Sequence, residues 1–164
     1  MNLPKKSSKL YKDILPLSEP LVCGVVLVID PSIGSSSSSP GVALYEQGEL
    51  VFATEINTGG SHLPLWRRAR ELGLQLSALC AKHHPDVLVF EDIPATSGYN
   101  QNAVASLLKA VGVTLACTTS DHVLGVHPTS WKGCVRDEYV KGDANDAKEI
   151  GVIVIETAKN ILAR

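Results

Sequence analysis

The chain has 164 residues, of which 45% are hydrophobic, and this is typical of one globular domain rather than a disordered chain. Its longest apolar runs, residues 21–29 and 151–155, are too short to cross a bilayer, so we expect no membrane partner. The formal net charge of −2 is a weak argument against nucleic-acid binding, for which a basic surplus is usual.

Residues 1–20 carry four lysines and no apolar stretch long enough for a signal peptide, so we interpret them as a basic N-terminal lead-in. They could be a solvated tail or an arm that contacts phosphates. The remaining residues, 21–164, are predicted to form a single domain.

Three predicted strands open that domain. The β-branched run from Leu21 to Asp30 fits a central strand buried on both faces, and Pro31 ends it. Residues 33–41, with five consecutive serines, are interpreted as a turn or loop. Residues 41–46 and 50–56 flank a short glycine-containing turn and predict a hairpin, so these strands should form an antiparallel meander.

Helices and strands then alternate. Apolar residues at steps of three and four predict an amphipathic helix that begins near an N-cap at Ser61 and ends near Pro85. The later predicted elements are a strand at 87–90 that ends at Glu91, a helix at 102–113, a strand at 122–126, a helical turn at 129–136 and a helix at 143–162. This order predicts an α/β fold, a mixed five-stranded sheet with helices on both faces.

The four cysteines lack the spacing of a zinc site, and we read them as reduced thiols of an intracellular, cytoplasmic protein. The histidines are scattered, and His83-His84 before a proline is more typical of a helix end than of a metal site. Packing is the expected role of Trp66 and Trp131, although Trp131 and Tyr99 could also stack on exposed bases.

Four acids stand where this fold would bring them together. Asp30 and Glu91 end two parallel strands, whose carboxyl ends lie at one sheet edge, while Asp143 and Asp146 share one face at a helix start. Each acid alone could be a turn residue or could complement a helix dipole. The joint pattern instead favours a site for Mg²⁺ or Mn²⁺, because oxygen ligands select hard cations and relieve the repulsion between carboxylates.

Two such ions can activate a water and stabilise the leaving oxygen of a phosphodiester. If four acids hold metal ions, thirteen acids remain against fifteen Lys and Arg, which weakens the charge argument against nucleic acid.

Several segments resemble the RuvC family of Holliday-junction resolvases, which belongs to the ribonuclease H-like superfamily. The resemblance covers about residues 21–147 in order. Its segments are Val28-Ile-Asp30-Pro-Ser, Pro40-Gly41-Val-Ala-Leu, Pro85-Asp86-Val-Leu-Val-Phe-Glu91, the asparagines Asn100 and Asn102 before a helix, His127-Pro-Thr-Ser-Trp-Lys132, and Asp143-Ala-Asn-Asp146-Ala.

The resemblance implies a ribonuclease H-like fold, a homodimer and a crossover-junction endodeoxyribonuclease, which nicks four-way and other branched DNA in pairs with about two divalent ions per site. It implies that Asp30, Glu91, Asp143 and Asp146 bind metal and that Lys132 lies near the scissile phosphate.

The chain departs from the family in its serine-rich turn. It also has only ten residues between Lys132 and Asp143, where the family has another helix. In an alternative register, residues 142–150 match the segment before that helix, and the terminal acids are then absent.

Three rival functions remain open. Another nuclease of this superfamily, a ribonuclease H or a transposase-like enzyme, would use the same acids on a different substrate. A catalytically inactive relative would only bind DNA or protein. A sugar-kinase-like ATP-binding fragment shares the opening strands, but its phosphate loops need more glycine than residues 33–41 offer.

Overall fold

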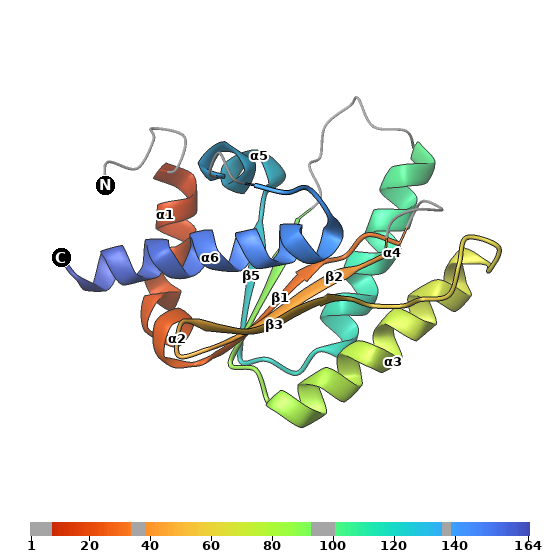
Figure 1. The fold of residues 1–164 in the computed structure, drawn as a ribbon, viewed down its shortest axis with the longest axis horizontal. Coiled ribbons are helices and arrows are strands. Elements are labelled where there is room, and N and C mark those ends of the chain that lie inside the picture. Colours follow the sequence, from red (N-terminus) through yellow and green to blue (C-terminus); the bar gives the residue numbers. More distant parts are fainter. Residues whose placement is uncertain (1–7, 34–38, 93–100, 136–138) are drawn as a thin grey trace.

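A five-stranded mixed sheet organises the chain, in the spatial order β3-β2-β1-β4-β5 (Figure 1). The computed structural model describes residues 8–33, 39–92, 101–135 and 139–164. The strands are β1 (Val25–Asp30), β2 (Gly41–Glu46), β3 (Glu49–Glu55), β4 (Val87–Glu91) and β5 (His122–Val126). The first three form the predicted antiparallel meander, and β4 and β5 run parallel to β1.

Helices cover both faces of this sheet, as predicted (Figure 1). On one face lie α3 (Leu65–His83) and α4 (Gln101–Cys117). The other face is covered by α6 (Asp143–Leu162), with α1 (Ser8–Ile14) and α2 (Ser18–Cys23) beside it. The short helices η2 (Leu15–Leu17), α5 (Pro128–Trp131) and η3 (Lys132–Cys134) complete the described elements. The predicted α/β fold, a mixed five-stranded sheet with helices on both faces, is therefore confirmed.

The prediction that residues 1–20 are a lead-in outside the domain is wrong for residues 8–20, and residues 1–7 lie outside the described part. Leu10 and Ile14 are buried in the same core cluster as the inner face of α6. They are four residues apart and so lie on one helical face, which α6 and the sheet cover. The domain therefore begins within the segment that its lysines made look like a solvated tail.

Some predicted boundaries also differ. The strand predicted from Leu21 begins at Val25, because residues 18–23 form α2. Helix α3 begins after Pro64 rather than at a Ser61 cap, and α4 continues four residues beyond the predicted end to Cys117. Trp66, predicted to pack, is 66% exposed.

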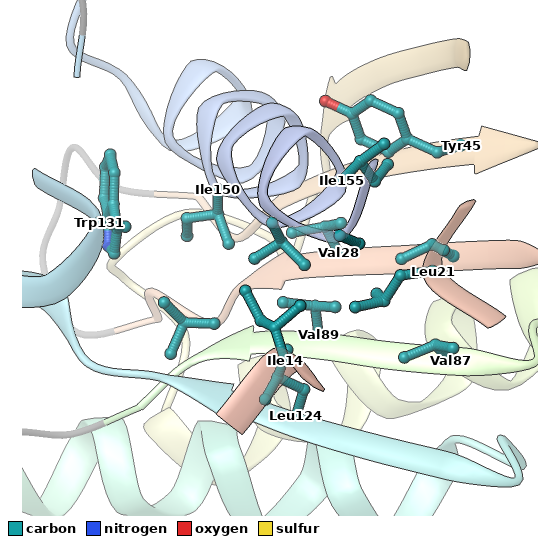
Figure 2. Packing of buried hydrophobic residues seen from close by; sticks show 14 of the residues in the cluster. Ile14, Leu21, Val28, Tyr45, Val87, Val89, Leu124, Trp131, Ile150 and Ile155 are labelled. Carbon is teal, nitrogen blue, oxygen red and sulfur yellow. The ribbon is translucent and has the colours of Figure 1, made fainter. Parts of the chain in front are cut away.

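The face under α6 is packed closely enough to fix the helix on the sheet. Figure 2 shows Ile150 and Ile155 of α6 above Val28 of β1, with Ile14 and Leu21 filling the space beside them. A Cβ atom on Gly151 would stand 2.2 Å from the Tyr45 ring, so the absence of a side chain lets α6 approach β2. The Tyr45 hydroxyl donates to the Lys148 carbonyl and ties the helix to the strand. The sheet thus determines where the first turn of α6 lies.

Among the described residues, no helix combines the length and the apolar character needed to cross a membrane.

Candidate metal centre

Two acids end neighbouring parallel strands. Ile29 of β1 pairs with Phe90 of β4, so the next residues, Asp30 and Glu91, stand side by side at one edge of the sheet. Asp30 is only 7% exposed, and Glu91 is half-buried. Because both strands are buried along their length, each carboxylate is held by a rigid backbone rather than by a loop.

The third acid comes from α6. Asp146 lies in its first turn and is 6% exposed. One carboxylate oxygen from each of Asp30, Glu91 and Asp146 lies within 4.8 Å of the other two. The structure therefore brings together three of the four predicted acids, from three separate elements.

A glycine allows α6 to deliver Asp146 there. A Cβ atom on Gly41, at the start of β2, would stand 1.8 Å from the Asp143 carbonyl oxygen and 2.8 Å from the Ala144 nitrogen. The backbone of α6 thus passes directly over a glycine, and a larger residue at this position would push the helix start away from the sheet edge.

The fourth predicted acid, Asp143, lines the same pocket but does not belong to the group of three. Its Oδ2 accepts a hydrogen bond of 2.9 Å from the Ser39 amide, on the segment that leads into β2. Asp143 therefore faces the pocket from its rim, close enough for its charge to act on Asp30.

Lys132 also reaches the site, from the 3₁₀ turn after β5. Its Nζ lies 3.2 Å from Glu91 Oε1 and 5.0 Å from the centre of the Trp131 ring. Half of the side chain is exposed, and it lines the pocket with the acids. The ammonium can therefore meet an incoming anion while it balances part of the acidic charge.

Burial and repulsion between the acids determine the electrostatics. Desolvation and then the charges of Glu91, Asp143 and Asp146 raise the pKa of Asp30 to about 8, against a smaller opposite effect of Lys132. Burial also raises the pKa of Glu91, although Lys132 favours its charged form. Burial is the main cause of the raised pKa of Asp143 as well.

This donor set fits a hard divalent cation. The three converging groups offer only carboxylate oxygens, the ligands that Mg²⁺ and Mn²⁺ prefer. A cation at this position would reverse the unfavourable interactions that raise the pKa of Asp30. The residues present therefore match the predicted kind of metal.

No protein-family model and no curated protein sequence matches the chain. Solved structures do. Thermus thermophilus RuvC in complex with a Holliday junction substrate is 13% identical, with a TM-score of 0.58 over 85% of this chain and 94% of that chain. Another Thermus thermophilus RuvC structure is 14% identical, with a TM-score of 0.52 over 85% and 95%. The yeast mitochondrial Holliday junction resolvase Ydc2 is 14% identical, with a TM-score of 0.60 over 94% and 87%.

The chain has the fold of the RuvC-type resolvases. The family suggested by the ordered motifs is thus confirmed at the level of the fold. Of the two acids in Asp143-Ala-Asn-Asp146, the structure places Asp146 with Asp30 and Glu91.

Sequence reasoning missed three contacts that two aromatic side chains make at the acidic site. The Tyr139 hydroxyl donates to Asp146 Oδ1, and the Tyr139 ring packs edge-on against Trp131. Packing was predicted for Trp131, which is fully buried, but contact with Lys132 was not. The adjacency of Trp131 and Lys132 gave a signal for one contact, whereas no pattern linked Tyr139 to Asp146. Tyr99 and Asn100 lie outside the described residues.

Proposed function

We propose that the chain is a structure-selective DNA endonuclease that resolves four-way junctions and other branched DNA by metal-dependent hydrolysis of phosphodiester bonds. The observation that carries this proposal is the convergence of Asp30, Glu91 and Asp146 at one sheet edge. One similar structure is RuvC in complex with a Holliday junction substrate, and another is the Holliday junction resolvase Ydc2; both support the substrate class.

In this proposal Asp30, Glu91 and Asp146 hold the metal, and Asp143 completes the ligand set from the rim. Two Mg²⁺ or Mn²⁺ ions bound there would supply an activated water and would stabilise the leaving oxygen. Lys132 binds the scissile phosphate through its half-exposed ammonium, and Glu91 holds that ammonium beside the acids. The buried strand ends keep the carboxylates in place, so little reorganisation is needed during the reaction.

Basic residues near the site support a path for DNA despite the negative net charge. Arg67 and Arg70 are exposed at the start of α3 and make no ion pair with any residue in the described ranges. Their neighbour Arg68 is buried and donates through Nη1 to the Ile33 carbonyl at 2.5 Å. Ile33 is three residues beyond Asp30, so this basic helix start is joined to the segment that leaves the metal centre.

The enzyme acts as a homodimer in this proposal, because two symmetry-related sites can nick two equivalent strands of a junction.

The cysteines Cys23, Cys80, Cys117 and Cys134 are free thiols, which agrees with the proposed reducing, cytoplasmic location.

A supercoiled plasmid that extrudes a four-way junction tests the function. Paired nicks give linear product in Mg²⁺, whereas unpaired nicks give open circles. We expect linear product, and none with EDTA. Open circles alone, or equal cutting of plain duplex, would count against a resolvase.

The same assay separates the rival functions. Preferential cutting of an RNA–DNA hybrid would indicate a ribonuclease H. Junction binding without cleavage in either metal would indicate an inactive relative, a reading that the intact acids disfavour.

A further inference from the structure

Two aromatic side chains in edge-on contact connect the two sides of the acidic site. Trp131 and Tyr139 are 6.1 Å apart between ring centres, with their planes at 76°. Trp131 lies under the Lys132 ammonium, which bridges to Glu91, and the Tyr139 hydroxyl donates to Asp146. The indole Nε1 has no hydrogen-bond partner of normal geometry, yet it lies close enough to Glu91 to favour its charged form. The pair therefore spans the site from the acid on β4 to the acid on α6.

Trp131 is rigid enough to support both contacts. Its side chain is fully buried, with 0% solvent exposure, and belongs to the cluster beneath α6. Figure 2 places it at the end of that cluster nearest to Ile150 of α6. A large ring held in this way has few alternative rotamers, so the position of the Tyr139 ring is well defined.

The orientation of the Asp146 carboxylate depends on side-chain contacts more than the orientations of Asp30 and Glu91 do. Asp30 and Glu91 are fixed by the paired backbone of two strands, whereas Asp146 stands on a helix start. Its Oδ1 receives the Tyr139 hydroxyl and, at 3.4 Å, the Gly142 amide. Because these donors bind Oδ1, the other oxygen of the carboxylate is available to a cation.

We propose that Tyr139 is a positioning residue for the metal centre: its hydroxyl, supported by the Trp131 ring, orients the Asp146 carboxylate toward the ion that Asp30 and Glu91 share. The proposal rests on the proposed metal-dependent function and assigns a role to a side chain outside the four predicted acids. Tyr139 does not itself touch the ion or the DNA in this proposal.

The expected size of the effect follows from the behaviour of groups that orient metal ligands. Loss of such a partner costs about 10–100-fold in metal affinity or activity. Tyr139→Phe keeps the ring and its edge contact with Trp131 but removes the donor. We therefore expect about ten-fold weaker Mn²⁺ binding, with the loss of cleavage recovered at saturating Mn²⁺ and with the KM for junction DNA unchanged.

Tyr45→Phe is the matched control. It removes one hydroxyl that also bonds to α6, at the Lys148 carbonyl, but that touches none of the acids. Mn²⁺ binding to the wild type, Tyr139→Phe and Tyr45→Phe proteins is measured by electron paramagnetic resonance without DNA, and cleavage is measured against Mn²⁺ concentration. A weaker Mn²⁺ affinity in Tyr139→Phe alone supports the proposal.

Two results would overturn it. Equal Mn²⁺ affinity in the wild type and Tyr139→Phe proteins would show that the hydroxyl does not orient Asp146. Equal weakening in both variants would show a general effect of α6 packing. Failure of the wild type protein to bind Mn²⁺ would instead remove the metal centre itself, and the proposed function with it, so the two failures are distinguishable.

Discussion

Replacing Asp30 with Asn should stabilise the metal-free protein while it abolishes cleavage. The pKa of Asp30 rises from 3.8 to about 8, and each unit corresponds to about 1.4 kcal/mol. Ionised Asp30 therefore costs the metal-free fold about 6 kcal/mol at pH 9. The buried amide of Asn gives back about 1–3 kcal/mol if its groups are poorly paired, which leaves a net gain of about 3 kcal/mol. For a chain of this size the melting temperature should rise by roughly 6–12 °C.

The sign of the pH dependence follows from the raised pKa. Below pH 3.8 the carboxyl is protonated in both the folded and the unfolded chain, and its burial carries no ionic cost. As the pH rises from about 4 to about 8, the unfolded chain releases this proton more readily, so the wild type loses stability in that window. Asp30→Asn should lose less stability across the same window, and near pH 4 it should not be more stable than the wild type.

Thermal melts in EDTA and in Mg²⁺ check this reasoning. Mg²⁺ at about 100 times its Kd should stabilise the wild type by about 2.7 kcal/mol and should stabilise Asp30→Asn far less. Asp121→Asn is the control, because Asp121 is exposed just before β5, at the opposite end of the strands. A melting temperature in EDTA at pH 9 that is no higher for Asp30→Asn than for wild type would refute the electrostatic argument. Wild-type turnover by the same variant in Mg²⁺ would remove Asp30 from the metal centre.

Three further outcomes are expected. Lys132→Ala should slow junction cleavage by about 100-fold, as the loss of one stabilising donor does. It should weaken DNA binding by much less, because one phosphate contact is a small share of a large interface. Gel shifts measure the binding and single-turnover rates measure the cleavage, and equal losses in both would contradict a role at the scissile phosphate. Cleavage should occur in Mg²⁺ or Mn²⁺ and fail in Ca²⁺, whose looser coordination still allows DNA binding; full cleavage in EDTA would exclude the metal mechanism. Arg70→Gln should lower the slope of log DNA affinity against log salt concentration by about one. The control is Lys82→Gln, because Lys82 is exposed at the far end of α3, and this variant should leave the slope unchanged. Identical slopes for the two variants would remove the start of α3 from the DNA path.

The meander and the first two acids could be predicted because local signals determine them. A hairpin turn with positive φ at Gln47 and Gly48 joins β2 to β3, and the sequence marks it with a glycine between two strand-like runs. Once β1 and β4 are parallel neighbours, the residues that end them must share one edge. Asp30 and Glu91 therefore meet without any assumption about distant side chains.

The N-terminal helices could not be predicted in the same way. The prediction gave the lysines of residues 1–20 more weight than the apolar residues Leu10, Ile14 and Leu17, which lie among and just after them. Leu10 and Ile14 gain their burial from α6, more than a hundred residues later in the chain. The opposite error at Trp66 concerns the faces of α3. Leu65 packs against the core and Arg68 is buried in the same first turn, whereas Trp66 lies on the outer face and is 66% exposed.

Asp143 and Asp146 show most clearly where sequence spacing stops being informative. Three residues apart on a helix, they share a face, and this alone predicts that both join the other acids. The approach of the α6 backbone to Gly41 brings the Asp143 carboxylate against the Ser39 amide at the rim. One turn deeper, Asp146 accepts a hydrogen bond from the Tyr139 hydroxyl and lies with Asp30 and Glu91. The difference between the two acids thus comes from contacts with β2 and with the segment after β5, which only the folded chain brings together. Because Asp146 rather than Asp143 lies with the other acids, loss of Asp146 should weaken metal binding more than loss of Asp143.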